Sequence, residues 1–195
     1  MQEVRTACRC WKKGADGTWK VKYDSCSSDL PVPGLLVPTG APAAGASAEV
    51  KKLGDIVGRW QIDGTFKPDP KFPAGPVALS LDCQWFASGL EVVCAYGGVL
   101  AGQPYQSADF YSYDGKTKTY SDYSVATFGG ATPGTLTIQP GIWVHVFDTQ
   151  AEGKPAKQRL TMTNMSPDGG DWKNEISVAG GAWASAGGGK YGKAK

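Results

Sequence analysis

Hydrophobic and polar residues alternate with a period of two along most of the chain from Gly58 onward. Successive side chains of a strand point to opposite faces of a sheet, so this alternation predicts β-strands with one buried face. Turn residues, chiefly Gly beside Asp, Ser or Pro, separate the runs. The pattern predicts ten strands, at residues 58–66, 76–86, 90–97, 105–113, 117–125, 134–139, 141–148, 157–165, 170–178 and 181–193.

The short connections between these strands favour an antiparallel meander, because successive strands joined by tight turns pair with each other. A meander of eight to ten strands loses its exposed edges when it closes into a barrel. We therefore predict an all-β fold with a closed antiparallel barrel. A two-sheet sandwich is the alternative.

Three segments differ in pattern. Residues 1–29 predict a cysteine-bearing hairpin, and residues 30–48 are rich in Pro, Gly and Ala, which is typical of an extended linker. Residues 49–195 form the barrel domain. At its start, Val50, Leu53 and Val57 have helical spacing, and Ser47 is a suitable N-cap, so a short helix is expected before the first barrel strand.

The five cysteines suggest disulfides. A turn at Ser88-Gly89 sets a register that places Cys83 opposite Cys94, within reach of a bridge. A two-residue turn would make them a hydrogen-bonded pair, an unusual site for a bridge, so a longer loop is also considered. Two buried free thiols are the alternative. In the extension, Cys26 is expected to pair with Cys10 or Cys8, which leaves one odd thiol.

Cysteine enrichment favours an exported protein, periplasmic or secreted, whose signal peptide has been removed; a cytosolic protein with reduced thiols is the alternative. The net charge of +2 gives no case for nucleic acid as a partner, and no apolar run approaches 18 residues, so no membrane-spanning helix is expected. No cofactor-binding motif is found.

His145 is the only histidine, which excludes a site built on paired histidines, and no metal site is predicted. Three roles are considered for His145: a general base, a ligand contact, or a hydrogen-bonded core residue. Most carboxylates fall in or beside turns, such as Asp114 and Asp168, each of which precedes a Gly. No spacing places two carboxylates in one site; those considered are Asp109, Asp114, Asp122, Asp148, Asp168, Asp171 and Glu175. No catalytic residue is predicted beyond the weak candidate His145.

Aromatic residues are the strongest candidates for binding. Inside a barrel they would line an apolar cavity with a few hydroxyl and indole donors, suited to a small hydrophobic ligand. The alternative is that they fill the core. The expected ligand-binding residues are Trp85, Tyr111, Tyr113, Trp143 and His145.

Residues 53–193 resemble bacterial lipocalin-like (calycin) proteins of the "domain of unknown function 1579" type. The resemblance starts at LGDIVGRW, where Gly58-Arg59-Trp60 is similar to the Gly-x-Trp of lipocalins. It continues through the segments FYSYDGKTKTY, RLTMT, SPDG and EIS, Trp183, and GKYGK at 189–193. It implies a β-barrel and no agreed activity. It also implies that a late basic residue, Arg159 or Lys190, packs on Trp60 through a cation–π contact that closes the barrel.

These observations favour a non-enzymatic barrel that binds a small hydrophobic ligand. One alternative is a structural or assembly subunit, a homo-oligomer or a partner of another protein, in which residues 1–48 pair with or disulfide-link to a neighbouring chain. A second alternative is a barrel enzyme, an isomerase or cyclase that uses His145.

Overall fold

The structure, a computed structural model, describes residues 5–13, 19–28, 40–68, 73–86, 88–127, 131–151 and 153–194. For residues 5–13 and 19–28 it describes the backbone alone. The chain divides into two compact units, Met1–Val37 and Pro38–Lys195. Each unit is described by itself.

The first unit contains an antiparallel hairpin of β1 (Arg5–Lys13) and β2 (Trp19–Ser28). Its register places Cys26 opposite Ala7 and Cys10 opposite Tyr23. The side chains of this hairpin lie outside the described part of the structure, so the bridge from Cys26 to Cys10 or Cys8 stays a prediction.

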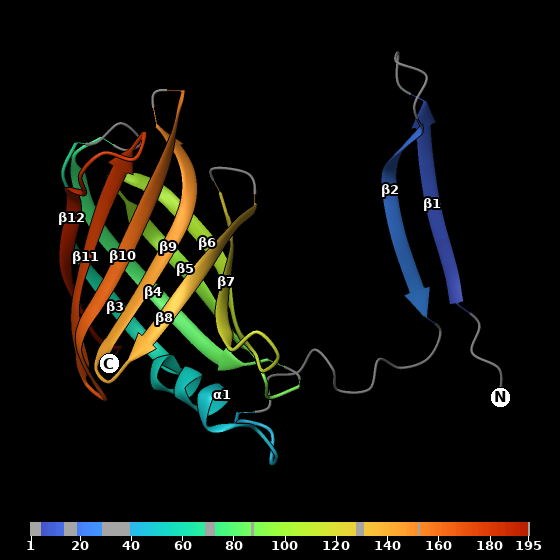
Figure 1. Ribbon diagram of the computed structural model, residues 1–195, viewed down its shortest axis with the longest axis horizontal. Coiled ribbons are helices and arrows are strands. Elements are labelled where there is room, and N and C mark those ends of the chain that lie inside the picture. Colours follow the sequence, from blue (N-terminus) through green and yellow to red (C-terminus); the bar gives the residue numbers. More distant parts are fainter. Residues whose placement is uncertain are drawn as a thin grey trace. The chain divides into compact units, whose positions relative to one another are not determined.

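The second unit is an all-β domain whose ten described strands form a closed antiparallel barrel (Figure 1), as predicted. Each strand pairs with the next along the chain, and β12 pairs with β3 to complete the ring. The strands are β3 (Gly58–Phe66), β4 (Gly75–Trp85), β5 (Val92–Leu100), β6 (Gln103–Asp114), β7 (Thr119–Ala126), β8 (Ala131–Gln139), β9 (Ile142–Ala151), β10 (Lys154–Ser166), β11 (Gly169–Val178) and β12 (Ala184–Lys193).

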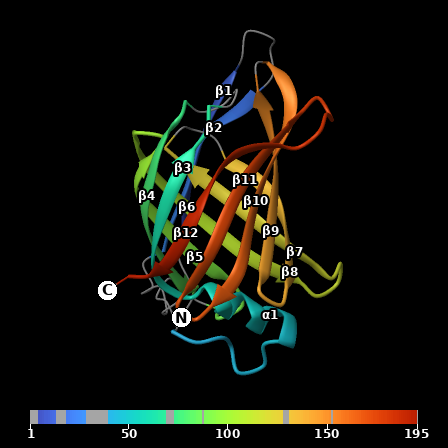
Figure 2. The same ribbon diagram turned by 90° about the vertical axis from the view of Figure 1, so that its left-hand side faces the viewer.

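One end of the barrel is covered by α1 (Ala48–Lys52) and the 3-10 helix η1 (Leu53–Ile56), seen below the strands in Figures 1 and 2. Ser47 caps α1 as predicted, because its Oγ accepts a hydrogen bond of 3.2 Å from the backbone N–H of Val50. Leu53 and Ile56 are buried against the barrel interior. Among the described residues, no helix has the length and apolar character needed to cross a membrane.

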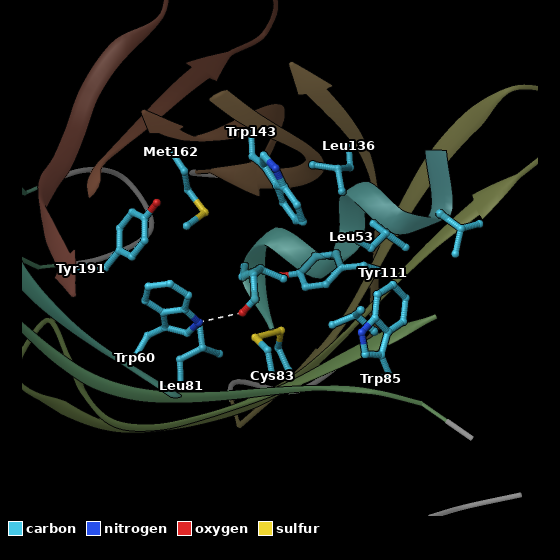
Figure 3. Close-up of a cluster of buried hydrophobic side chains, with 14 of the residues drawn as sticks. Leu53, Trp60, Leu81, Cys83, Trp85, Tyr111, Leu136, Trp143, Met162 and Tyr191 are labelled. Atoms are coloured by element: carbon cyan, nitrogen blue, oxygen red, sulfur yellow. Dashed lines mark hydrogen bonds between the residues drawn. A yellow bond between two sulfur atoms is a disulfide. The ribbon is translucent and has the colours of Figure 1, made fainter. Parts of the chain in front are cut away.

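Under η1 the barrel interior is solid. Side chains from several strands converge on Leu53, among them Trp85, Tyr111 and Trp143, as Figure 3 shows. Leu53 is fully buried, and Trp143 and Tyr111 are each only 1% exposed. Burial of large apolar side chains is the main favourable term in folding, so this closed-end core anchors the domain.

Trp60 joins the helix to the strands that close the barrel. Its indole Nε1 donates a hydrogen bond of 2.7 Å to the carbonyl of Ile56, and its ring meets Tyr191 edge-on at 5.6 Å (Figure 3). Lys193, the residue opposite Trp60 on β12, places its Nζ 3.8 Å from the centre of the indole ring. The expected cation–π contact therefore exists.

The prediction that Arg159 or Lys190 supplies this contact was wrong. On β12, Lys190 lies opposite Asp63 of β3, three residues beyond the inward-facing Trp60, so its side chain points to the other face of the sheet. Arg159 lies opposite Glu175 and donates hydrogen bonds to its carboxylate, with its guanidinium 4.3 Å from the Trp183 ring. Both residues are therefore on the outer side of the sheet.

The predicted bridge between Cys83 and Cys94 is confirmed. Phe86 and Glu91 form the last backbone hydrogen bond of the β4–β5 ladder, so the connection is longer than two residues. Hydrogen-bonded and non-hydrogen-bonded residue pairs alternate along an antiparallel ladder. Three pairs beyond the hydrogen-bonded pair Phe86–Glu91, Cys83 and Cys94 form a non-hydrogen-bonded pair, in which side chains lie closer together. The longer loop considered from the sequence thus explains how the bridge fits.

Reduction of this bridge should lower the free energy of unfolding by about 3 kcal/mol, the chain-entropy value for a loop of this size. Urea unfolding with and without a thiol reductant measures it. The double variant Cys83→Ala/Cys94→Ala keeps the three N-terminal cysteines and serves as control. If the reductant lowers the free energy of unfolding of that variant as much as it lowers that of the wild type, the Cys83–Cys94 bridge is not the source of the effect.

Gly58→Ala should destabilise the fold by about 1–3 kcal/mol, because Gly58 has φ +132° and an added Cβ would lie 2.5 Å from Lys193 Nζ. Gly97→Ala is the matched control: it is also a strand glycine, without a positive φ, and its nearest neighbour would be 3.8 Å away. Equal midpoints of urea unfolding for the two variants would contradict a special role for Gly58.

Candidate functional site

The barrel interior is hollow beyond the closed-end core. A cavity of about 400 Å³ extends from Ile56 and Trp60 towards the strand ends far from η1, where Phe66 and Leu100 lie. This volume falls in the range of sites for small molecules. Most of its walls are apolar or aromatic, including Phe66, Leu79, Tyr96, Phe147 and Trp172.

A few polar side chains interrupt these apolar walls. Asp109 from β6 and Ser124 from β7 line the cavity, and Ser124 Oγ donates a hydrogen bond of 2.6 Å to Asp109 Oδ1. Tyr111 donates a longer one, of 3.4 Å, to Asp109 Oδ2. Gln158 and Asn174, on another part of the wall, are linked to each other by a hydrogen bond of 3.2 Å.

Burial raises the pKa of Asp109 to about 6, since the carboxylate has lost most of its contact with water. The nearby carboxylate of Asp122 also contributes to this raised pKa, whereas the hydrogen bond from Ser124, the charge of His145 and the hydrogen bond from Tyr111 lower it. Among the described residues, no lysine or arginine forms an ion pair with Asp109. Its negative charge therefore stays poorly compensated next to the cavity.

His145 and Asp122 form a buried pair behind this carboxylate. The Nδ1 atom of His145 lies 2.8 Å from Asp122 Oδ2, and the two residues are 1% and 2% exposed. Within the described structure, His145 Nε2 and Asp122 Oδ1 have no hydrogen-bond partner. This arrangement matches the role of a hydrogen-bonded core residue, one of the three considered for His145.

The structure brings the predicted binding residues together, but in the closed-end core and not around the cavity. Trp85, Tyr111, Trp143 and His145 are all buried, and none of them is among the residues that line the cavity. Tyr113 is partly buried and packs on the ring of Tyr120 at the same closed end. The aromatic cavity walls come from other strand positions.

Sequence reasoning missed Asp109, Asp122, Ser124 and Tyr96. Asp109 and Asp122 lie within β6 and β7, in agreement with the strands predicted at 105–113 and 117–125, and both face the interior. The available signal was parity, since Asp109 and Tyr111 share one strand face. In the described part of the chain, no group of three or more His, Cys, Asp or Glu residues is arranged to hold a metal ion.

Comparisons with known proteins support the fold. No family model matches this chain, and no curated protein does, so the resemblance to lipocalin-like proteins of unknown function stays a prediction. The structure is similar to the crystal structure of Rv2717c from M. tuberculosis, with a TM-score of 0.53 and 10% sequence identity. The match covers 77% of this chain and 99% of that one. At this identity the similarity shows a shared barrel fold alone.

The raised pKa of Asp109 gives a pH-dependent prediction. The folded state binds this proton more tightly than the unfolded state, so the contribution to stability is complete below pH 3.8 and is lost as pH rises through about 6. Asp109→Asn, which imitates the protonated form, should match the wild type near pH 4. At pH 7.5 it should be more stable by up to about 3 kcal/mol.

Urea unfolding of both proteins between pH 4 and pH 8 measures this difference. Asp148→Asn is the control, because Asp148 is exposed on β9 and pairs with Lys157 at the surface. A constant difference between Asp109→Asn and the wild type across this range would show that Asp109 is not a buried acid with a raised pKa.

Proposed function

We propose that this protein is a non-enzymatic barrel that binds a small, mainly apolar ligand in its interior. The observation that carries the proposal is the cavity of about 400 Å³ with aromatic and aliphatic walls. A ligand that enters such a space leaves water for an apolar surface, which is favourable by roughly 25 cal/mol per Å² of apolar area. A few fixed polar groups, here Asp109 and Ser124, then orient it.

The closed-end core prepares this cavity for binding. Helix η1 and the side chains around Leu53 fill one end, and the Cys83–Cys94 bridge ties β4 to β5 beside them. The walls therefore belong to a rigid scaffold, which lowers the ordering cost of binding. The bridge also supports our proposal that the protein works outside the cytoplasm, where disulfides persist.

The dye N-phenyl-1-naphthylamine, which is neutral and fluoresces in apolar surroundings, should bind the full-length protein with saturation at one dye per chain. Ala126→Trp should weaken this binding at least about tenfold, equal to about 1.4 kcal/mol, because Ala126 lines the cavity and a bulky side chain would occupy it. Fluorescence titration measures both proteins.

Ala95→Trp is the matched control, since Ala95 is exposed on the outer side of β5. Thermal unfolding checks that both variants are folded. Absence of saturable binding to the wild type, or equal weakening by the two substitutions, would count against a ligand site inside the barrel.

A further inference from the structure

One carboxylic acid lines the cavity among the residues that the structure describes. Among its described lining residues, Asp109 is the one side chain from Asp, Glu, Lys, Arg or His. Asp109 is 9% exposed, and the hydrogen bonds that it accepts from Ser124 and Tyr111 come from neutral hydroxyl groups. A carboxylate has about four acceptor positions, so it keeps capacity for a further donor.

The surroundings of Asp109 increase its demand for a positive charge. A second carboxylate, that of Asp122, lies close enough to disfavour ionisation of Asp109. The charge of His145 offsets this in part, but the hydrogen bond of its Nδ1 is made with Asp122 and not with Asp109. A buried carboxylate without a cationic partner costs free energy, because desolvation is not offset by an ion pair. A ligand with an ammonium group would supply the missing charge.

Aromatic rings near the carboxylate suit the same ligand. Tyr96 lines the cavity, and its hydroxyl lies 3.4 Å from that of Tyr111, which in turn donates to Asp109. Tyr105 also lines the cavity, and its pKa is raised by burial and, in addition, by the nearby charge of Asp109. Tyrosine faces attract cations, most strongly where water is excluded.

We propose, on the basis of the function proposed above, that the cavity selects ligands with a cationic amine head and an apolar body, and that Asp109 binds the amine. The carboxylate and the ammonium form a charge-assisted hydrogen bond at the cavity wall, and the apolar body occupies the space between Phe66, Leu79 and Trp172. A ligand with a carboxylate head would meet a like charge at the same point and is disfavoured.

The proposal also links binding to a proton. At pH 6 Asp109 is about half protonated, and an ammonium beside it favours the ionised form, so amine binding should release up to about half a proton. The charged or titratable groups that face Asp109 from the neighbouring strands are Tyr96 on β5, Tyr105 and Tyr111 on β6, Asp122 on β7 and His145 on β9.

The test displaces N-phenyl-1-naphthylamine from the full-length protein at pH 7.5 with octylamine, octan-1-ol and octanoate, which share one chain length and differ in head group. Octylamine should bind at least about tenfold tighter than octanoate. Asp109→Asn should weaken octylamine at least about tenfold and change octan-1-ol by no more than about twofold. The control Asp148→Asn, on the outer face, should leave all three affinities unchanged.

A second measurement uses the wild type alone, so it does not depend on the folding of a variant. Calorimetric titration with octylamine at pH 6, in two buffers of different ionisation enthalpy, should show proton release, and octan-1-ol should show none. If the dye does not bind, the proposed ligand site itself is overturned. If the dye binds but octylamine is not preferred, or no proton is released, only the amine specificity is overturned.

Discussion

Closure of the sheet between β12 and β3 is the constraint on which the rest of the structure depends. It removes both sheet edges, and with ten described strands it also fixes the width of the interior. An eight-stranded barrel can be filled by its own side chains, and the diameter grows with strand number. A ring of ten therefore needs help to fill its interior. Helix η1 supplies it at one end, through Leu53 and Ile56, and the other part stays hollow.

The boundary between the filled and hollow parts explains where the buried charges lie. Asp122 and His145 lie in the packed region and are hydrogen bonded to each other, whereas Asp109 borders the cavity. Charges are expensive in a low-dielectric interior unless they are paired. The paired groups are thus the deeper ones, and the carboxylate with a raised pKa is the one that lines the cavity.

The fold could be predicted from the sequence because hydrophobic and polar residues alternate along its strands. The strand order, the capped helix at Ser47 and the register of Cys83 with Cys94 all depend on period and parity, which are local properties. The partner of Trp60 was missed because this local pattern is absent from part of β12. The segment Gly187-Gly188-Gly189 of β12 has no alternation, so nothing in it showed that Lys193, and not Lys190, lies opposite Trp60.

The candidate site was harder to predict, because its residues break the pattern that reveals the strands. Asp109 and Asp122 occupy inward strand positions where an apolar residue is expected, and no spacing in the sequence shows that residues of two different strands meet at one site. Apolar side chains of similar volume at these positions would have packed the core without the cost of burying charge. Departures from the local rule are expected where function requires them. A carboxylate at the wall of an apolar cavity, hydrogen bonded to the neutral hydroxyl groups of Ser124 and Tyr111, adds a cost to the stability of the fold, and the ligand-binding role that we propose would account for that cost.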